Sequence, residues 1–159
     1  RCSCYGGSQM ITYRQPTALD VPVLTSLERS MFPDYPWSQA QFKEEIAGLG
    51  GTRQFILALS DGSIIGYAGI MVVAAGVPAD LLTIAILPDF RGQGLAQEML
   101  AELENWAKAK GATEVILEVD TKNENAIRLY KFARYEEIST RANYYGLGLD
   151  ALIMRKELK

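Results

Sequence analysis

A glycine-rich turn lies between an apolar strand-like run and a long helical pattern. The turn reads Arg91-Gly92-Gln93-Gly94-Leu95-Ala96. Glycine lets the backbone approach a ligand closely, and the free amides of a first helical turn, with the helix dipole, attract phosphate oxygens. The Lys-Ser/Thr of a Walker A loop is missing, and Gln97 stands where a G-x-G-x-x-G motif has its third glycine. The turn is therefore either a pyrophosphate-binding turn or an ordinary strand-to-helix connection.

One acidic side chain stands inside an apolar run. Glu118 lies between Leu117 and Val119, in a segment that we expect to be a central strand. A buried carboxylate without a partner is costly, so Glu118 is predicted to be functional, or else to be paired in a salt bridge or exposed at the end of a strand. Burial raises the pKa of a glutamate above its usual ~4.3. Such a shift suits a base that takes a proton from an ammonium group.

The absence of histidine narrows the chemistry further. With no histidine in the chain, Ser-His-Asp and Cys-His catalysis and most zinc sites are excluded. A general base must then be a carboxylate, a lysine, a tyrosine or water, and no metal is expected. The two cysteines, Cys2 and Cys4, both lie at the N-terminal end, so no disulfide framework is expected and a reducing cytoplasm is the predicted compartment.

Hydrophobic periodicity places these residues on alternating strands and helices. Helices are predicted from Thr17 to Met31, with an apolar stripe of Val23, Leu24, Leu27 and Met31, from Ser38 to Gly48, from Leu95 to Lys110, and after Asn123. Strands are predicted over Ile11–Arg14, Arg53–Leu59, Ile64–Val73, Leu81–Leu87, Val115–Asp120, Tyr135–Ser139 and Ala151–Lys156. This order predicts a mixed α/β sheet with one right-handed crossover in its middle.

Length and composition fit one globular domain. The chain has 159 residues, of which 48% are hydrophobic and 22% charged. No apolar run approaches the ~20 residues of a membrane helix. A net charge of −3 argues against a general nucleic-acid binder. The linker-like Gly6-Gly7-Ser8 precedes Met10, so we expect residues 1–9 to be an added tail and residues 10–159 to be a single domain.

Two signatures carry a resemblance to a known family. Arg91-x-x-Gly94-x-Ala96 resembles motif A of the GNAT superfamily of N-acetyltransferases, (Arg/Gln)-x-x-Gly-x-(Gly/Ala), and Asn123-x-x-Ala126-x-x-Leu129-Tyr130 resembles its second signature. Pro36-Trp37-Ser38, Leu117-Glu118-Val119 and the run 141–145 look like the RimI-type ribosomal-protein alanine N-acetyltransferases. The resemblance covers residues from Met10 to the C-terminus. It implies an N-acetyltransferase domain with a GNAT-like α/β fold: a mostly antiparallel sheet, a splayed parallel strand pair and flanking helices.

The resemblance also implies how a cosubstrate is bound. Acetyl-CoA would lie with its pantetheine arm along the backbone of Ile84, Ala85 and Ile86, like a missing strand. The amides of the turn 91–96 would hold the pyrophosphate, and Asn123 would reach the cosubstrate from the other side. For Ile84 and Ile86, core packing is an alternative that can hold at the same time.

Two catalytic roles follow from the same resemblance. Glu118 would remove a proton from the acceptor amine, directly or through water, and Tyr130 would protonate the departing thiolate. From its helical spacing alone, Tyr130 would be a core residue. The family usually has a glycine where this chain has Arg134. Because an arginine in the left-handed conformation costs about 1 kcal/mol, the exit of the helix after Tyr130 is expected to differ.

The sequence specifies least about the amine that would accept the acetyl group. Trp37, Tyr144 and Tyr145 are candidates for an acceptor groove, although they could be ordinary surface aromatics. The favoured acceptor is a protein N-terminus, the alanine of a ribosomal protein in particular. A lysine side chain or a small amine is the alternative, and a non-catalytic CoA-binding module is a third, which the presence of both Glu118 and Tyr130 disfavours. We expect a monomer or weak dimer without nucleic-acid or membrane partners.

Overall fold

A single sheet organises the part of the chain that the computed structural model describes, residues 9–159. Its seven strands follow the order β1-β2-β3-β4-β5-β7-β6, and all neighbours are antiparallel except β4 and β5. The strands are β1 (Ile11–Arg14), β2 (Arg53–Ser60), β3 (Ser63–Met71), β4 (Ala79–Ile86), β5 (Glu114–Asp120), β6 (Glu136–Gly146) and β7 (Leu149–Glu157). This arrangement confirms the predicted mixed sheet with its one parallel pair.

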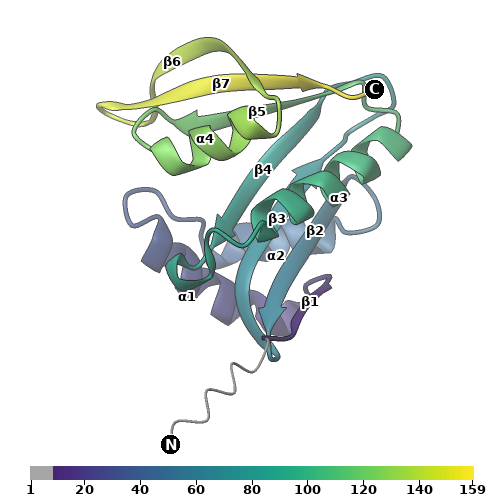
Figure 1. Cartoon of the computed structure of the whole chain (residues 1–159), viewed down its shortest axis with the longest axis vertical. Helices are drawn as coiled ribbons and strands as arrows, with labels where there is room; N and C mark the ends of the chain where they lie inside the picture. Colours follow the sequence, from purple (N-terminus) through teal and green to yellow (C-terminus); the bar gives the residue numbers. More distant parts are fainter. Residues whose placement is uncertain (1–8) are drawn as a thin grey trace, which may run out of the picture.

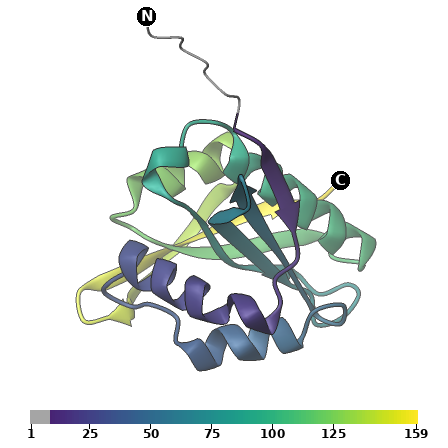
Figure 2. The same ribbon diagram turned by 90° about the horizontal axis from the view of Figure 1, so that it is seen from below.

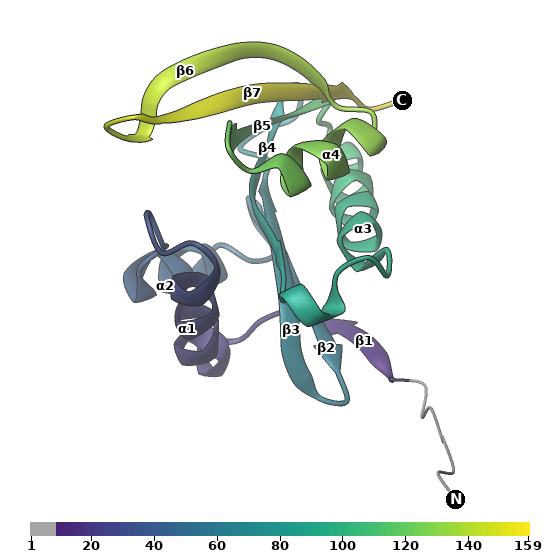
Figure 3. The same ribbon diagram turned by 60° about the vertical axis from the view of Figure 1, so that its left-hand side comes forward.

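Helices cover both faces of the sheet (Figures 1 and 3). One face carries α1 (Val21–Met31) and α2 (Gln39–Ala47), which Figure 2 shows side by side below the strands, and the other carries α3 (Leu95–Ala109) and α4 (Glu124–Phe132). Short 3₁₀ turns, η1 (Ala18–Asp20) and η2 (Pro88–Phe90), precede α1 and the glycine-rich turn. The expected caps are present, because Ser38 accepts from the amide of Gln41 and Asn123 from that of Ala126.

The core consists of one apolar cluster on each face. On the α3 face, buried Met99, Leu100 and Leu103 belong to a cluster with strand residues such as Val115. On the α1–α2 face, Leu24 and Phe42 cluster with Tyr67 of β3. The predicted stripe of α1 is wrong at Val23, which is 48% exposed, whereas Glu28 is only 3% exposed. The buried face of α1 is therefore rotated toward Val21, Leu24 and Glu28.

The parallel pair is splayed. Strands β4 and β5 share only two residue pairs, Ala79↔Val115 and Asp80↔Ile116, before they diverge. Beyond them β5 stays bonded to β7 along its whole length, and Figure 3 shows β5, β6 and β7 turned away from the rest of the sheet. The remainder of β4 is bonded only to β3. The resulting opening between β4 and β5 is called the fork below.

The last two strands are longer than the periodicity predicted. Strand β6 continues to Gly146 rather than ending at Ser139, and it includes the run 141–145. Nearly all of its residues are exposed, so the strand has no apolar alternation that could reveal its length.

The exit of α4 keeps the geometry that a glycine would give. Arg134 has φ 74°, in the left-handed region. The amide of Tyr135 donates to the carbonyl of Tyr130 at 2.9 Å, and that of Arg134 to Lys131 at 3.0 Å. These bonds close the helix C-terminus in the usual way. The expectation that the exit would differ is therefore wrong, and the arginine bears the conformational cost.

The predicted tail lies outside the described residues except for Gln9, so that assignment and the domain boundary at Met10 stay predictions. None of the helices in residues 9–159 is long and apolar enough to cross a membrane.

Candidate active site

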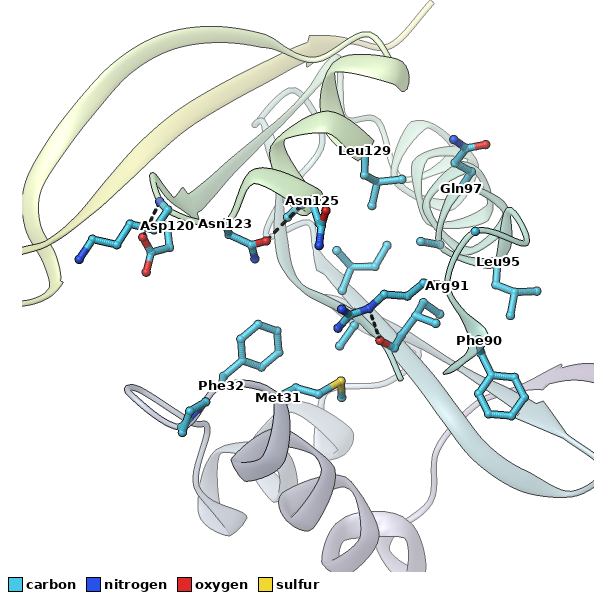
Figure 4. Close-up of a pocket in the computed structure, with 18 of the residues that line it drawn as sticks. Met31, Phe32, Phe90, Arg91, Leu95, Gln97, Asp120, Asn123, Asn125 and Leu129 are labelled. Carbon is cyan, nitrogen blue, oxygen red and sulfur yellow. Dashed lines mark hydrogen bonds between the residues drawn. The ribbon is translucent and has the colours of Figure 1, made fainter. Parts of the chain in front are cut away.

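A cavity of about 660 Å³ opens in the fork. It lies between the α1–α2 connection, the end of β4, the glycine-rich turn and the start of α4 (Figure 4). The predicted residues that line it are Ile84, Ala85, Ile86, Arg91, Gly92, Gly94, Leu95, Ala96 and Asn123. Among the residues that the predictions did not include are Met31, Phe32, Tyr35, Phe90 and Asp120. Gln93, Glu118, Tyr130, Trp37, Tyr144 and Tyr145 do not line it.

The glycine-rich turn presents free amides to this cavity. Gly92 and Gly94 have φ 81° and 79°, and a Cβ on either would meet no atom within 4 Å. Gly94 is the N-cap of α3 without a side-chain cap. Among residues 9–159, no acceptor bonds the amides of residues 92–97. Unsatisfied amides at the positive end of a helix dipole suit an anion such as a pyrophosphate.

Arg91 holds the turn against the strand. Its Nε donates to the carbonyl oxygen of Ile86 at 3.0 Å, and its side chain lies across the middle of the cavity (Figure 4). The Ile86 carbonyl of β4 is therefore already hydrogen-bonded within the protein.

The backbone of β4 offers a ligand only some of the groups predicted for it. The amide of Leu87 donates to Ile65 of β3 at 2.8 Å. Along an antiparallel ladder, hydrogen-bonded residue pairs alternate with pairs that are not hydrogen-bonded. The backbone groups of Ala85 therefore also point to β3, and those of Ile84 and Ile86 point into the fork. The prediction that all three residues present backbone groups there is wrong for Ala85. The Ile86 carbonyl accepts the Nε of Arg91, so one of its two lone pairs is already used within the protein.

Asn123 lies across the cavity from the turn. Its Oδ1 accepts the amide of Ala126 at 3.1 Å, as a cap of α4 (Figure 4). The helix that it caps thus fixes the orientation of its carboxamide beside the cavity.

Glu118 lies half-buried on β5, on the α1–α2 face of the sheet. Burial raises the pKa of its carboxyl, and the negative charge of Asp80 adds to the shift, whereas Arg141 opposes it. Within residues 9–159, Glu118 forms no ion pair and no hydrogen bond to another side chain. The salt-bridge interpretation is therefore not supported, and the raised pKa agrees with the expected direction.

The ring of Tyr130 is packed in the core, but its hydroxyl oxygen remains accessible. Its ring meets Tyr135 edge-on at 5.8 Å, and burial raises the pKa of its hydroxyl. No hydrogen bond engages this hydroxyl within residues 9–159, yet no buried side-chain oxygen or nitrogen there lacks a partner. The hydroxyl oxygen must therefore border accessible space, so that core packing and a chemical role are compatible.

The structure separates the three predicted acceptor aromatics. Trp37 packs against Phe42 at 5.3 Å and Phe55 at 6.2 Å, which places it between α2 and the sheet. Tyr145 stacks on Tyr35 at 4.4 Å, and Tyr144 meets Tyr145 edge-on at 4.9 Å. Only the two tyrosines of β6 therefore form an aromatic group beside Glu118.

Sequence reasoning missed Tyr35. Its hydroxyl donates to Asp120 Oδ2 at 3.1 Å, and its ring stacks on Tyr145. It thereby joins the α1–α2 connection to β5 and β6 over one side of the cavity. Nothing in the local pattern indicates this, because the three segments are distant in sequence.

Glu28 was missed as well. Its carboxylate accepts hydrogen bonds from the hydroxyl of Tyr67 and, at 3.4 Å, from the amide of Trp37. These bonds attach the end of the α1–α2 connection to β3. The available signal is its position four residues after Leu24, on the apolar face of α1.

Comparisons with known proteins agree with this geometry. Residues 21–133 match the model of the acetyltransferase (GNAT) family. N-alpha-acetyltransferase RimI of Mycobacterium tuberculosis is 31% identical over 154 residues, 94% of each chain. An uncharacterised protein of Mycobacterium leprae is 37% identical over 145 residues, 89% of this chain but only 39% of that protein.

Solved structures share the fold. The ribosomal-protein-S18-alanine N-acetyltransferase of Escherichia coli superposes with a TM-score of 0.78 at 27% identity, over 94% of this chain and 95% of that one. Arabidopsis thaliana NAA60 in complex with acetyl-CoA gives a TM-score of 0.83 at 20% identity, over 94% and 99%.

The buried carboxyl of Glu28 predicts a pH-dependent stability difference. Burial raises its pKa above the unfolded value, so the wild-type protein loses this contribution as pH rises through the folded pKa. Glu28→Gln removes that dependence. Wild type therefore loses stability relative to Glu28→Gln as pH rises, so we expect the free energy of urea unfolding of Glu28→Gln minus that of wild type to increase from pH 4.5 to pH 7. Glu44→Gln, at an exposed glutamate of α2, is the control, and an equal trend in both variants would contradict the assignment.

Proposed function

Because the chain belongs to the acetyltransferase (GNAT) family and is an N-acetyltransferase, we propose that it acetylates the α-amine of a protein N-terminus, with the N-terminal alanine of a ribosomal protein as acceptor. The observation that carries this proposal is the combination of a RimI relative matched over 94% of both chains with a fork that opens a cavity between β4 and the end of β5, two residues from Glu118. The longer Mycobacterium leprae relative contributes nothing to the choice of acceptor.

Acetyl-CoA is the cosubstrate of this family, and the described residues fit it. The free amides of residues 92–97 bind the pyrophosphate, with the positive end of the α3 dipole behind them. The amide and carbonyl of Ile84 and the amide of Ile86 pair with the pantetheine arm in the fork, where β5 no longer does so. Asn123 closes the cavity from α4.

Glu118 acts as the general base. It takes a proton from the acceptor ammonium, directly or through one water, and its raised pKa brings it closer to that of the amine. The neutral nitrogen then attacks the thioester carbonyl carbon, and a backbone amide of β4 stabilises the negative charge that develops on the oxygen. As the carbon–sulfur bond breaks, the electron pair leaves with the sulfur. The nitrogen, now bonded to the acetyl carbon, releases its second proton to solvent, which gives the neutral amide.

Tyr130 returns a proton to that sulfur. An ordinary phenol is a weaker acid than a thiol of pKa ~8.5 by about 1.5 pKa units, so proton transfer to the thiolate is uphill by about 2 kcal/mol. The raised pKa of Tyr130 keeps the hydroxyl protonated at working pH but widens this gap, so the transfer takes place only as the sulfur becomes basic in the collapsing intermediate. Its hydroxyl borders accessible space, through which the phenolate regains a proton from solvent.

The acceptor enters beside Tyr144 and Tyr145. These rings and Glu118 lie together on the α1–α2 face, and Tyr35 holds the α1–α2 connection against them. An N-terminal peptide in extended form can lie there with its ammonium toward Glu118.

The acceptor class is tested by thiol release from acetyl-CoA with a panel of amines. We expect the highest kcat/KM with a peptide that begins with alanine, and at least tenfold lower values with the same peptide acetylated at its N-terminus but carrying a lysine, and with small amines. Preference for either of the latter would contradict the N-terminal assignment, and no release with any amine would contradict catalysis.

The glycine-rich turn is tested with Gly94→Asp. The new carboxylate points into open space at the turn and repels the pyrophosphate. We expect the thermal stabilisation by acetyl-CoA, about 2.7 kcal/mol at a hundred times Kd, to vanish in this variant. Gly76→Asp is the matched control, because Gly76 also has a positive φ, +82°, and open space around its Cβ position. Equal stabilisation of both variants would show that the pyrophosphate binds elsewhere.

Tyr130→Phe isolates the hydroxyl. Phenylalanine keeps the packing against Tyr135, so the midpoint of unfolding should change little. General-acid catalysis is worth about 10²–10⁴-fold, so we expect kcat to fall in that range while the Kd of acetyl-CoA stays constant. Tyr13→Phe, which removes a phenol of β1 that bonds Glu98 in the first turn of α3, is the control for the loss of a tyrosine hydroxyl outside the fork. A kcat within about threefold of wild type in Tyr130→Phe would assign Tyr130 to packing.

A further inference from the structure

A second carboxylate lies at the vertex of the fork. Asp80 forms the last residue pair between β4 and β5, opposite Ile116. Glu118 follows two residues further along β5, on the same face as Ile116. The spacing of strands and residues puts the two acidic residues roughly 8 Å apart, where the strands begin to diverge.

Both acids face the α1–α2 side of the sheet. The other face of β5 carries Val115, Leu117 and Val119 into the α3 cluster. On β4, the neighbouring residue Leu81 belongs to that same α3 cluster together with its partner Ile70. Since successive side chains of a strand alternate between faces, Asp80 points to the opposite face. The side chains of Asp80 and Glu118 therefore emerge together beside the fork.

Neither acid has a partner in the described part of the chain. Both are half-buried, and no ion pair or side-chain hydrogen bond engages either of them within residues 9–159. This contrasts with Glu28 and Glu104, which are buried against tyrosine hydroxyls. Since no fully buried side-chain oxygen within residues 9–159 lacks a hydrogen-bond partner, the carboxylate oxygens of both acids remain accessible, so that a cationic ligand can reach them.

The side chains around the two acids indicate which charge the ligand carries. Arg141 of β6 acts on Glu118, Arg53 of β2 acts on Asp80, and the phenol of Tyr144 faces both acids. Tyr145 also faces Glu118. Arg53 is already paired with Glu45 and Arg141 lies against the ring of Tyr144. The group therefore has room for one more cation.

We propose that Asp80 is the second carboxylate of the acceptor site, and that Asp80 and Glu118 hold the acceptor's primary ammonium between them at the vertex of the fork. This inference rests on the proposed N-terminal acetylation. The glycine-rich turn follows the opposite end of β4, about 20 Å away by the rise of the strand. A cosubstrate extended along β4 from that turn brings its thioester toward the vertex, where the ammonium is held.

Asp80 is a positioning residue here, since it acts on the amine together with Glu118 and on Glu118 itself. Burial raises the pKa of both carboxyls, and the charge of Asp80 raises that of Glu118 further, whereas Arg141 lowers it. Removing the charge of Asp80 must therefore lower the pKa of Glu118, and removing the charge of Arg141 must raise it.

The first test is carboxyl ¹³C NMR titration of the free protein, with Glu118→Gln used to assign the Glu118 signal. We expect Asp80→Asn to lower the pKa of Glu118 by about half to one unit, and Arg141→Gln to raise it. Glu114→Gln, on the same face of β5, should leave it unchanged. An unchanged titration in Asp80→Asn would overturn the inference.

The second test is steady-state kinetics with the alanine peptide. We expect Asp80→Asn to raise the KM of the peptide about three- to tenfold, to shift the acid limb of kcat/KM to lower pH, and to leave the KM of acetyl-CoA unchanged. Acetyl-CoA-induced thermal stabilisation confirms that the variant is folded. If wild type acetylates the peptide but Asp80→Asn behaves like Glu114→Gln, the inference fails and the proposed function stands. If wild type does not acetylate it, the proposed function fails.

Discussion

Two residue pairs of parallel hydrogen bonding hold β4 against β5, and the rest of each strand has another partner or none. Backbone amides and carbonyls need partners, so an unfilled edge inside a sheet is a place where a ligand can bind as a strand would. The opening persists because β5 is bonded to β7 throughout its length and turns with it away from β4 (Figure 3). The cavity, the access of solvent to Tyr130 and the position of Glu118 all depend on this divergence.

The two helical layers supply different parts of the site around that opening. The layer with α3 and α4 contributes the free amides at the N-terminus of α3 and the Asn123 cap of α4. They surround the end of the cavity at which we propose that the phosphates bind, the phosphate side. The layer with α1 and α2 contributes the connection over the side at which we propose that the acceptor binds, the acceptor side. Glu28 attaches this connection to β3, and Tyr35 attaches it to Asp120 and Tyr145. The acceptor side is thus built from side-chain contacts between distant segments, and the phosphate side from local backbone geometry.

Four acidic side chains, two buried and two half-buried, lie in two different environments. Glu28 and Glu104 each accept a hydrogen bond from a buried tyrosine, and Glu104 also binds Lys156 at 2.8 Å. These pairs join elements of the fold. Asp80 and Glu118 have no such partner among the described residues and lie side by side at the fork. The presence or absence of a hydrogen-bonded partner therefore distinguishes the acids that join elements of the fold from those that a substrate could reach.

Local features of the site were predictable from the sequence alone. The caps of α2 and α4, the glycine-rich turn, the strand that carries Glu118 and the family signatures all depend on residues within a few positions of one another, where propensity and hydrogen bonding are decided locally. Only the tertiary structure decided which strand β5 pairs with, how far β6 extends, that Ala85 points its backbone to β3, and that Trp37 packs against Phe42 while Tyr144 and Tyr145 meet Tyr35. It also placed Asp80 beside Glu118 and let Arg134 adopt a left-handed conformation. The physical reason is that strand pairing and side-chain burial join segments far apart in the chain, and their free energies outweigh the local preferences that a sequence pattern records.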